Sequence, residues 1–417
     1  MTAQKVLFIG LVWPEPNSSA AGTRIIQLVH LFKNQGYEIH FASAATLSDF
    51  SFELKSIGVS THDIALNHHS FNDFIGQLNP SIVIFDRFMI EEQYGWRVQQ
   101  ECPDAIRMLD TEDLHFLRQA RQLALKNHQT TEGAHLFNDL TKRELAAILR
   151  CDVSLIISEI EMEILQQQFK IDSSLLYYLP FLEEELAPEV TKEWNSYENR
   201  EGFVFIGNYL HEPNWQTLQY LKTNVWPLLS QQLPNTSLNI YGAYASQKVT
   251  QLNSSREKFI VHGRAENARN AIAKHRILLA PLLFGAGAKG KFIDAMQSGT
   301  PIISTSVGAE SMQGKLPWSG AIADGLEDLV KEAVKLYNDK TYWLNAQQNG
   351  IAIINQRYAK SKFEQAFLNY VAYLQSNLNT HRNANFIGSI LNFHSLQSTR
   401  YMSLWIEEKN KNTPQNS

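Results

Sequence analysis

The chain alternates short apolar runs with longer stretches whose apolar residues recur at helical spacing. This alternation is typical of α/β proteins with parallel sheets, because two parallel strands are joined by a crossover that usually contains a helix. The predicted strands of the first half cover residues 5–12, 38–43, 81–86, 105–110, 153–158 and 175–179. Those of the second half cover 203–206, 237–241, 258–261, 276–281 and 301–305. The expected fold class is therefore α/β, with doubly wound sheets.

A length of 417 residues favours two domains. Residues 183–202 are polar, acidic and without periodicity, so they are expected to form an exposed linker between an N-terminal domain (1–182) and a C-terminal domain (203–359). The predicted helices cover residues 22–34, 135–150, 214–232, 265–275, 288–298 and 325–356. A final amphipathic helix is predicted at 360–380, and it is followed by a tail at 381–417 whose last ten residues are expected to be disordered.

The net charge of −5 gives no global basic field, so nucleic acid is not an expected partner. Cys102 and Cys151 are too few for a disulfide framework and suggest reduced thiols in a cytoplasmic protein. No run approaches the ~18 uninterrupted apolar residues of a membrane-spanning helix. Contact with the inner face of a membrane is left open.

The densest chemical signal is FGAGAKGKFIDAM at residues 284–296, directly after a predicted strand and at the start of a predicted helix. A glycine-rich turn in this place lets a ligand approach the backbone, and the helix N-terminus favours a phosphate group. Lys289 and Lys291 add positive charge. An ordinary strand-to-helix turn without any ligand is the competing interpretation.

Two familiar phosphate motifs match this loop incompletely. The spacing of Gly285, Gly290 and Lys291 fits a nucleoside-triphosphate loop, but Phe292 stands where a hydroxyl should bind magnesium. Gly285, Gly287 and Gly290 also fit the dinucleotide fingerprint, although Glu310, the candidate ribose acid, follows its strand too late.

A third ligand, a nucleoside-diphosphate sugar, is indicated by the surroundings of the loop. FVFIGNYLHEPNW at 203–215, VWPLL at 225–229, LNIYG at 238–242, VHGR at 261–264 and the segment 284–310 together resemble the C-terminal domain of family 4 (group 1) retaining glycosyltransferases. The resemblance covers about residues 203–375. It implies the GT-B fold, in which two Rossmann-like domains face each other across a cleft and a last helix crosses back to the first domain.

The N-terminal half resembles the same family in its first strand and in the loop PEPNSSAAGTR at 14–24. The resemblance places Gly22 near the donor diphosphate, with Arg24 as a helper. Residues 109–118 and 150–165 also resemble segments that come later in the N-terminal domain of this family. On the acceptor side many relatives have a histidine near the place of Asp110, which we take as the acceptor-orienting group, with a helix cap as the alternative role.

In the C-terminal domain the resemblance assigns the ribose hydroxyls to Asp294. In many relatives another acid, eight residues before the ribose-binding one, lies near the donor sugar. Ala286 stands at that position here, so backbone amides of Gly287, Ala288 and Lys289 are expected to contact the donor instead. The family's basic pair is also missing, since Asn208 and Pro213 fall at those spacings. The diphosphate charge is therefore assigned to Lys289, with Lys291 as a second candidate.

The remaining expected substrate-binding residues lie in two loops. Asn208 and His211 follow the first strand of the C-terminal domain, and His211 either faces the cleft or caps the helix that Pro213 begins. Gly263 and Arg264, next to His262, are expected to border the nucleobase.

The sequence thus predicts a retaining glycosyltransferase that moves a sugar from a nucleoside diphosphate to a hydroxyl of a glycan or lipid-linked acceptor. No metal and no cofactor besides the nucleotide-sugar co-substrate is expected, and the oligomeric state is open. The alternatives are a nucleotide-sugar epimerase of the same fold and a non-catalytic nucleotide-sugar-binding subunit of a polysaccharide assembly complex.

Overall fold

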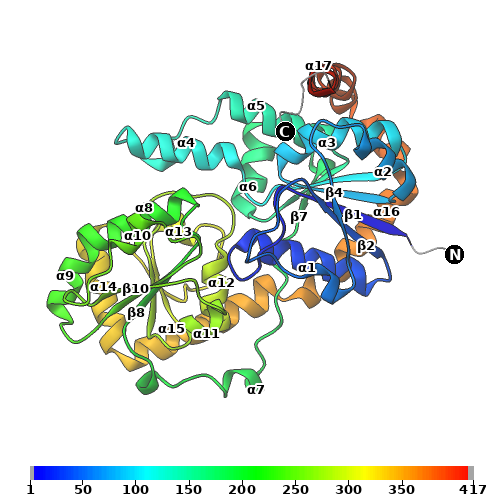
Figure 1. Cartoon of the computed structure of the whole chain (residues 1–417). Helices are drawn as coiled ribbons and strands as arrows, with labels where there is room; N and C mark the ends of the chain where they lie inside the picture. The colour runs from blue at the N-terminus through cyan, green and yellow to red at the C-terminus, as the bar shows by residue number, and fades with distance from the viewer. Residues whose placement is uncertain (1–3, 412–417) are drawn as a thin grey trace.

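The protein folds into two α/β lobes that lie side by side, as Figure 1 shows for the computed structural model, which describes residues 4–411. The N-terminal sheet has seven parallel strands in the order β3-β2-β1-β4-β5-β6-β7. The C-terminal sheet has six parallel strands in the order β10-β9-β8-β11-β12-β13. In each sheet the order reverses next to the first strand of the lobe, which is the doubly wound arrangement that places ligands at the carboxyl ends of the strands.

The strands of the first sheet are short and, apart from β3, largely buried. Their bounds are β1 Lys5–Gly10, β2 Glu38–Ser43, β3 Ser60–Asp63, β4 Ile82–Asp86, β5 Ile106–Asp110, β6 Val153–Ile156 and β7 Leu176–Tyr178. The strands of the second sheet are β8 Phe203–Ile206, β9 Leu238–Tyr241, β10 Phe259–Gly263, β11 Ile277–Ala280, β12 Ile302–Ser304 and β13 Gly320–Ile322. The sequence analysis missed β3 and β13, which lie at sheet edges.

Helices cover both faces of each sheet (Figure 1). In the first lobe they are α1 Ala20–Asn34, α2 Ser70–Leu78, α3 Phe88–Glu101, α4 His115–Lys126, α5 Asp139–Arg150 and α6 Glu159–Glu163. The connection carries α7 Pro188–Thr191. In the second lobe they are α8 Glu212–Tyr220, α9 Trp226–Gln232, α10 Gln247–Thr250, α11 Ala268–Ile272, α12 Gly290–Gln297, α13 Ser306–Ala309, α14 Leu326–Asn338 and α15 Lys340–Ile353.

Two long helices end the described chain, α16 Glu364–Ala384 and α17 Phe386–Lys411. The apolar residues Phe367, Val371 and Leu374 of α16 are buried in the core of the N-terminal lobe. The ring of Phe367 lies 5.9 Å from that of Phe32 in α1. This contact fastens the end of the chain to the lobe in which the chain begins.

Two sequence predictions of helix ends and disorder need correction. The predicted helix 325–356 is broken at Asp339, whose side chain accepts a hydrogen bond from the backbone N–H of Tyr342 and starts a second helix. Residues 408–411 belong to α17 and were wrongly expected to be disordered, while 412–417 lie outside the described residues. Cys102 and Cys151 are free and buried, as expected.

Most of segment 183–202 is exposed, as its composition predicted, but its two ends are buried. The side chain of Arg200 is fully buried and donates hydrogen bonds to Thr300 Oγ1 at 2.6 Å and to the carbonyl of Ser298 at 2.8 Å. Glu183, at the other end, is also buried. Both ends are therefore held by specific polar contacts. Within residues 4–411, no helix is long and apolar enough to cross a bilayer.

Candidate functional site

A cavity of about 430 Å³ lies between the two lobes. Its volume falls in the range of small-molecule sites. Its walls come from the loop before α1, from the ends of β4 and β5, and from the ends of β8, β9, β10 and β11 in the second lobe. The carboxyl ends of both sheets therefore open into one shared space. Among the predicted residues that line it are Asn208, His211, Arg264, Ala288, Lys289, Lys291 and Asp294.

The glycine loop connects β11 to α12 and forms one wall of this cavity. Gly287 has a positive φ of 64°, and a Cβ on it would lie 2.8 Å from the Cβ of Asp113 in the other lobe. Glycine is therefore required both for the turn and for the close approach of the lobes. Lys289 follows, and its Nζ donates a hydrogen bond to the carbonyl of Gly287 at 2.7 Å.

The amides of this loop are mostly used within the protein. Gly287 N–H donates to Glu161 Oε1 at 2.9 Å, and Lys289 N–H donates to Met312 Sδ at 3.3 Å. The expectation that the amides of Gly287 and Lys289 face the ligand is therefore wrong. Ala288 does line the cavity. The positive charge of the loop must come from its lysine side chains.

Lys291 lies in the first turn of α12 and points toward the loop after β8. Its Nζ donates to Asn214 Oδ1 at 2.6 Å and lies 4.5 Å from the centre of the Phe205 ring. The Lys291 ammonium therefore lies beside Asn208 and Pro213, the two positions at which the family's basic pair is missing. Lys291 thus supplies a cation to that part of the cavity from a different helix. Burial lowers the pKa of Lys291 to about 7 and that of Lys289 to about 8.

Asp294 lies one helical turn after Lys291 and lines the same cavity. Its Oδ1 accepts a hydrogen bond of 2.9 Å from Arg269 Nε. The Nη2 of Arg269 donates to Glu183 Oε2 at 2.7 Å, and Glu183 Oε1 accepts from Gln27 Nε2 in the first lobe. The acidic residue assigned to the solvated linker is therefore a buried member of the site. Burial raises the pKa of Asp294 and of Glu183, opposed by Arg269.

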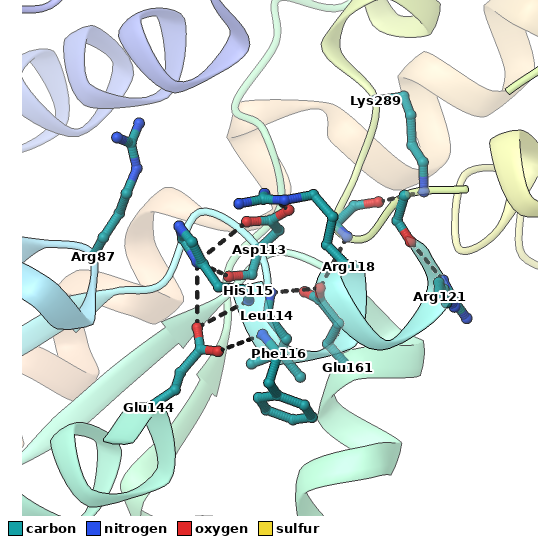
Figure 2. Close-up of polar contacts among 12 residues, drawn as sticks. Arg87, Asp113, Leu114, His115, Phe116, Arg118, Arg121, Glu144, Glu161 and Lys289 are labelled. Carbon is teal, nitrogen blue, oxygen red and sulfur yellow. Dashed lines mark hydrogen bonds and ion pairs between the residues drawn. The ribbon is translucent and has the colours of Figure 1, made fainter. Parts of the chain in front are cut away.

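Charged residues of the first lobe form the opposite wall. Arg87 directly follows β4, and Glu112 lies in the turn after β5. Both residues have a positive φ, 74° for Arg87 and 63° for Glu112. Such backbone is costly for a side chain with a Cβ and is concentrated at functional sites. Figure 2 shows Asp113 between His115 and Arg118, with the guanidinium of Arg87 directed away from them. All five side chains line the cavity.

The carboxylates of this wall differ in their electrostatic surroundings. Burial raises the pKa of Glu112 well above its ordinary value, and the neighbouring Asp110 and Asp86 raise it further. Its Oε1 is buried and has no hydrogen-bond partner. For Asp113, burial is outweighed by Arg118 and His115, which lower its pKa. The two adjacent carboxyl groups are thus suited to different protonation states.

Three predicted site residues of the N-terminal lobe, Gly22, Arg24 and Asp110, do not line the cavity. Asp110 is fully buried, and its Oδ1 accepts a hydrogen bond of 2.8 Å from Arg24 Nε. Arg24 also donates to the carbonyl of Leu179. Gly22 packs against the backbone of Glu15, where a Cβ would approach to 2.4 Å, and its N–H is bound by Ser19 Oγ. These three residues support the floor of the cavity from below.

The other predicted residues lie in two loops of the C-terminal lobe. His211 lines the cavity and makes no side-chain cap. Arg264 donates from Nε to Ser18 Oγ at 3.1 Å across the two lobes. Gly263 has a φ of 80° and shapes the turn before Arg264, but it does not line the cavity. His262 faces Asn239 instead, at 2.8 Å.

Two buried glutamates that the sequence analysis did not single out hold the start of α4. Figure 2 shows Glu144 accepting from the N–H groups of His115 and Phe116, and Glu161 accepting from Leu114 N–H at 2.8 Å. Because Glu161 also binds Gly287, it joins α4 to the glycine loop of the other lobe. Burial, with Asp113 nearby, raises the pKa of Glu161 to about 8.

The geometry disfavours the two competing nucleotide motifs. Phe292 is completely buried in the core, so no side chain there faces a magnesium ion. Glu310 is paired with Arg121 and lies outside the walls of the large cavity. Within residues 4–411, no cluster of three or more His, Cys, Asp or Glu residues has metal-binding geometry.

Comparisons with known proteins find a matching domain in the C-terminal lobe. Residues 200–339 match the family model described as glycosyl transferases group 1, and this segment contains the glycine loop, Lys291 and Asp294. No curated protein matches the chain. Most of the C-terminal lobe is thus similar to a group 1 glycosyltransferase domain.

Solved structures extend the likeness to both lobes. Sucrose-phosphate synthase from Thermosynechococcus elongatus has a TM-score of 0.66 at 12% identity over 89% of this chain and 99% of its own. Anabaena HepE in complex with UDP and glucose gives 0.63 at 12% over 88% and 99%. A Staphylococcus aureus TarM mutant in complex with UDP gives 0.55 at 12% over 72%, and this chain spans 57% of its length. The fold is therefore the GT-B fold of glycosyltransferases.

Proposed function

We propose that the protein transfers a sugar from a nucleoside-diphosphate sugar to a hydroxyl acceptor with retention of the anomeric configuration. The observation that carries this proposal is the placement of Lys289, Lys291 and Asp294 along one wall of a cavity whose opposite wall belongs to the other lobe. Two cations and a carboxylate in this arrangement match the diphosphate and the ribose of one ligand. The matched group 1 domain and the UDP-bound structural neighbours support it.

The donor would lie along α12. Lys291 and Asp294 are three residues apart and therefore share one face of this helix. The diphosphate would contact Lys289 and Lys291, and the ribose hydroxyls would be accepted by Asp294. The base would lie toward Arg264, at the far end of the cavity. The sugar would then face the acidic wall of the N-terminal lobe.

Catalysis would depend on stabilising the departing diphosphate. As the bond between the anomeric carbon and the phosphate oxygen breaks, negative charge develops on the phosphate, and the fixed lysine ammonium groups stabilise it in a largely dry cavity. The acceptor hydroxyl would attack from the same face and give its proton to the departing oxygen. We propose Glu112 as the acceptor-orienting residue in place of Asp110, because Glu112 lines the cavity and Asp110 is closed off by Arg24.

The expected acceptor is a glycan or a lipid-linked glycan precursor at the cytoplasmic face of a membrane. The acceptor wall contains Arg87, His115 and Arg118 beside Glu112 and Asp113, so it offers both donors and acceptors of hydrogen bonds. Such a surface is suited to the many hydroxyl groups of a carbohydrate.

Release of nucleoside diphosphate from a panel of UDP-, GDP- and ADP-sugars, with and without oligosaccharide and glycolipid acceptors, tests this proposal. Acceptor-dependent release, an α-linked product from an α-linked donor by NMR, and loss of both in Lys289→Ala are expected. Conversion of the donor sugar without an acceptor would indicate the epimerase. Tight donor binding with no turnover on any acceptor would indicate the binding subunit.

A further inference from the structure

The C-terminal helix α17 is arranged with its polar side toward the protein and its apolar side toward solvent. Figure 1 shows it on the N-terminal lobe, far from the C-terminal lobe, against α3 and α5. Its exposed large apolar side chains are Phe386, Ile387, Ile390, Phe393, Tyr401, Met402, Leu404 and Trp405. Phe393 and Trp405 are 64% and 60% exposed, which is unusual for residues of this size.

These apolar residues form a stripe along one side of the helix. Successive residues of a helix are about 100° apart, so Phe386, Ile390, Phe393, Tyr401 and Leu404 fall within a narrow sector. Ile387, Met402 and Trp405 widen it on one side. The stripe has two parts, 386–393 and 401–405, with the exposed Gln397 between them, and at about 1.5 Å per residue it is roughly 30 Å long.

The inner side of α17 is fixed by polar and small residues. Ser403 Oγ accepts from Arg97 Nη2 at 3.1 Å, and Glu407 pairs with His69 at 3.1 Å. A Cβ at Gly388 would lie 2.1 Å from the carbonyl of Leu149, so the helix approaches α5 closely there. Because these contacts would be lost on rotation, the helix cannot turn its apolar stripe inward at low cost.

The charges of α17 indicate what covers the stripe. Arg400 lies in the second half of the helix, and Lys409 and Lys411 lie at its end. Counting Glu407 and Glu408, with which Lys411 is paired, the net charge of α17 is 3 − 2 = +1 in a chain whose net charge is −5. The Lys409 ammonium lies 5.3 Å from the centre of the Trp405 ring. Basic residues beside tryptophan and tyrosine on an apolar helix face are typical of helices that lie in the interface of an anionic bilayer.

A second copy of the chain is a poorer match. One stripe of about 30 Å by about 10 Å covers roughly 300 Å², whereas each partner of a stable protein interface contributes about 800 Å². A flat lipid surface needs no such compact patch, because it meets the helix along its length.

We therefore propose that α17 is a membrane-surface helix that docks the N-terminal lobe on anionic lipid. Docking in this way would bring the acceptor wall near lipid-linked acceptors. Only this consequence rests on the proposed function; the membrane contact itself does not.

Co-sedimentation of the full chain with vesicles tests this proposal. Vesicles of phosphatidylcholine with 30% phosphatidylglycerol should bind the protein at least tenfold more tightly than phosphatidylcholine alone, and the triple change Phe393→Ser, Leu404→Ser, Trp405→Ser should remove binding. The double change Tyr373→Ser, Leu344→Ser removes exposed apolar groups of α16 and α15 and should leave binding unchanged.

Three results would overturn the proposal: no binding of the unaltered chain, equal binding to both vesicles, or a dimer by light scattering that the triple change converts to a monomer. The vesicle assay contains no donor or acceptor, so its failure is separate from failure of the transferase proposal. Circular dichroism should show that the triple variant retains its helices. Nucleoside-diphosphate affinity by calorimetry should stay within twofold of the unaltered chain.

Discussion

Arg121 of helix α4 holds Glu310 of the other lobe through two hydrogen bonds of 2.7 Å. The same guanidinium donates to the carbonyl of Gly285 at 2.8 Å. One side chain of the N-terminal lobe thus fixes both the start of the glycine loop and the segment after β12. Together with Glu161, which binds Gly287, it joins the N-terminal lobe to the wall that the glycine loop forms.

A double-mutant cycle on Arg121→Met and Glu310→Gln should measure the coupling between these two side chains. The pair is mostly buried and bidentate, so we expect an interaction of about 1–3 kcal/mol in the free energy of unfolding. The single change Arg121→Met should also weaken nucleoside-diphosphate binding, because Gly285 loses its support. Additive single changes, with no coupling above about 0.3 kcal/mol, would show that the contact does not hold the lobes together. The exposed pair Lys340–Glu198 provides a control with little expected coupling.

Nucleoside-diphosphate affinity should decrease as the pH rises above 7. Burial lowers the pKa of Lys291 to about 7, so the empty site loses this charge through neutral pH and binding must then restore the proton. Below pH 7 the lysine is already charged and this contribution is constant. Calorimetry of the unaltered chain at pH 6.5, 7.5 and 8.5 should therefore show a progressive loss of affinity.

Lys291→Arg separates this effect from other titrations, because a guanidinium stays charged throughout the range. The decline with pH should become shallower in Lys291→Arg, and Lys291→Ala should bind weakly at every pH. If affinity depended on pH identically in the unaltered chain and in Lys291→Arg, Lys291 would not contact the diphosphate.

Asp294→Ala should discriminate between two ligands. Loss of a hydrogen-bonding carboxylate typically costs roughly 1.5–3 kcal/mol, so nucleoside-diphosphate affinity should fall at least tenfold. Inorganic pyrophosphate lacks the ribose and should lose less than about threefold. Arg269→Met is the matched control, since it removes the hydrogen bond from Arg269 to Asp294 without removing the carboxylate. Equal losses for both ligands would show that Asp294 does not contact the ribose.

The Arg24–Asp110 pair should behave as a structural element. Both side chains are buried, so Arg24→Met would leave an uncompensated carboxylate and should cost about 3–5 kcal/mol of stability in denaturant unfolding. The double change Arg24→Met, Asp110→Leu should recover most of that loss. Abolished turnover in an Asp110→Asn variant of unchanged stability and unchanged donor affinity would instead restore Asp110 as the acceptor-orienting group.

The sequence predicted the buried strands well because each is a continuous apolar run, as parallel strands covered on both faces must be. It missed β3, Ser60–Asp63, because this edge strand is polar and partly exposed and carries no such run. It read α14 and α15 as one helix because apolar spacing continues past Asp339, where only the cap marks the break.

The candidate site was predictable where it is local. Lys289, Lys291 and Asp294 lie within six residues on one loop and helix, so their shared wall follows from the motif. Asp110 was misplaced because its partner Arg24 is 86 residues away, and no local pattern shows that this carboxylate is covered. Glu161 and Glu183 were missed for the same reason, since their roles come from contacts with the other lobe.

The most direct test of the account is a thermal-shift panel of UDP, GDP, ADP, ATP with magnesium, and NAD. A ligand at about a hundred times its dissociation constant adds about 2.7 kcal/mol to the folded state. We predict clear stabilisation by one nucleoside diphosphate without magnesium, and its loss in Lys289→Ala. Preference for ATP with magnesium or for NAD would contradict the assignment of the cavity to a nucleoside-diphosphate sugar.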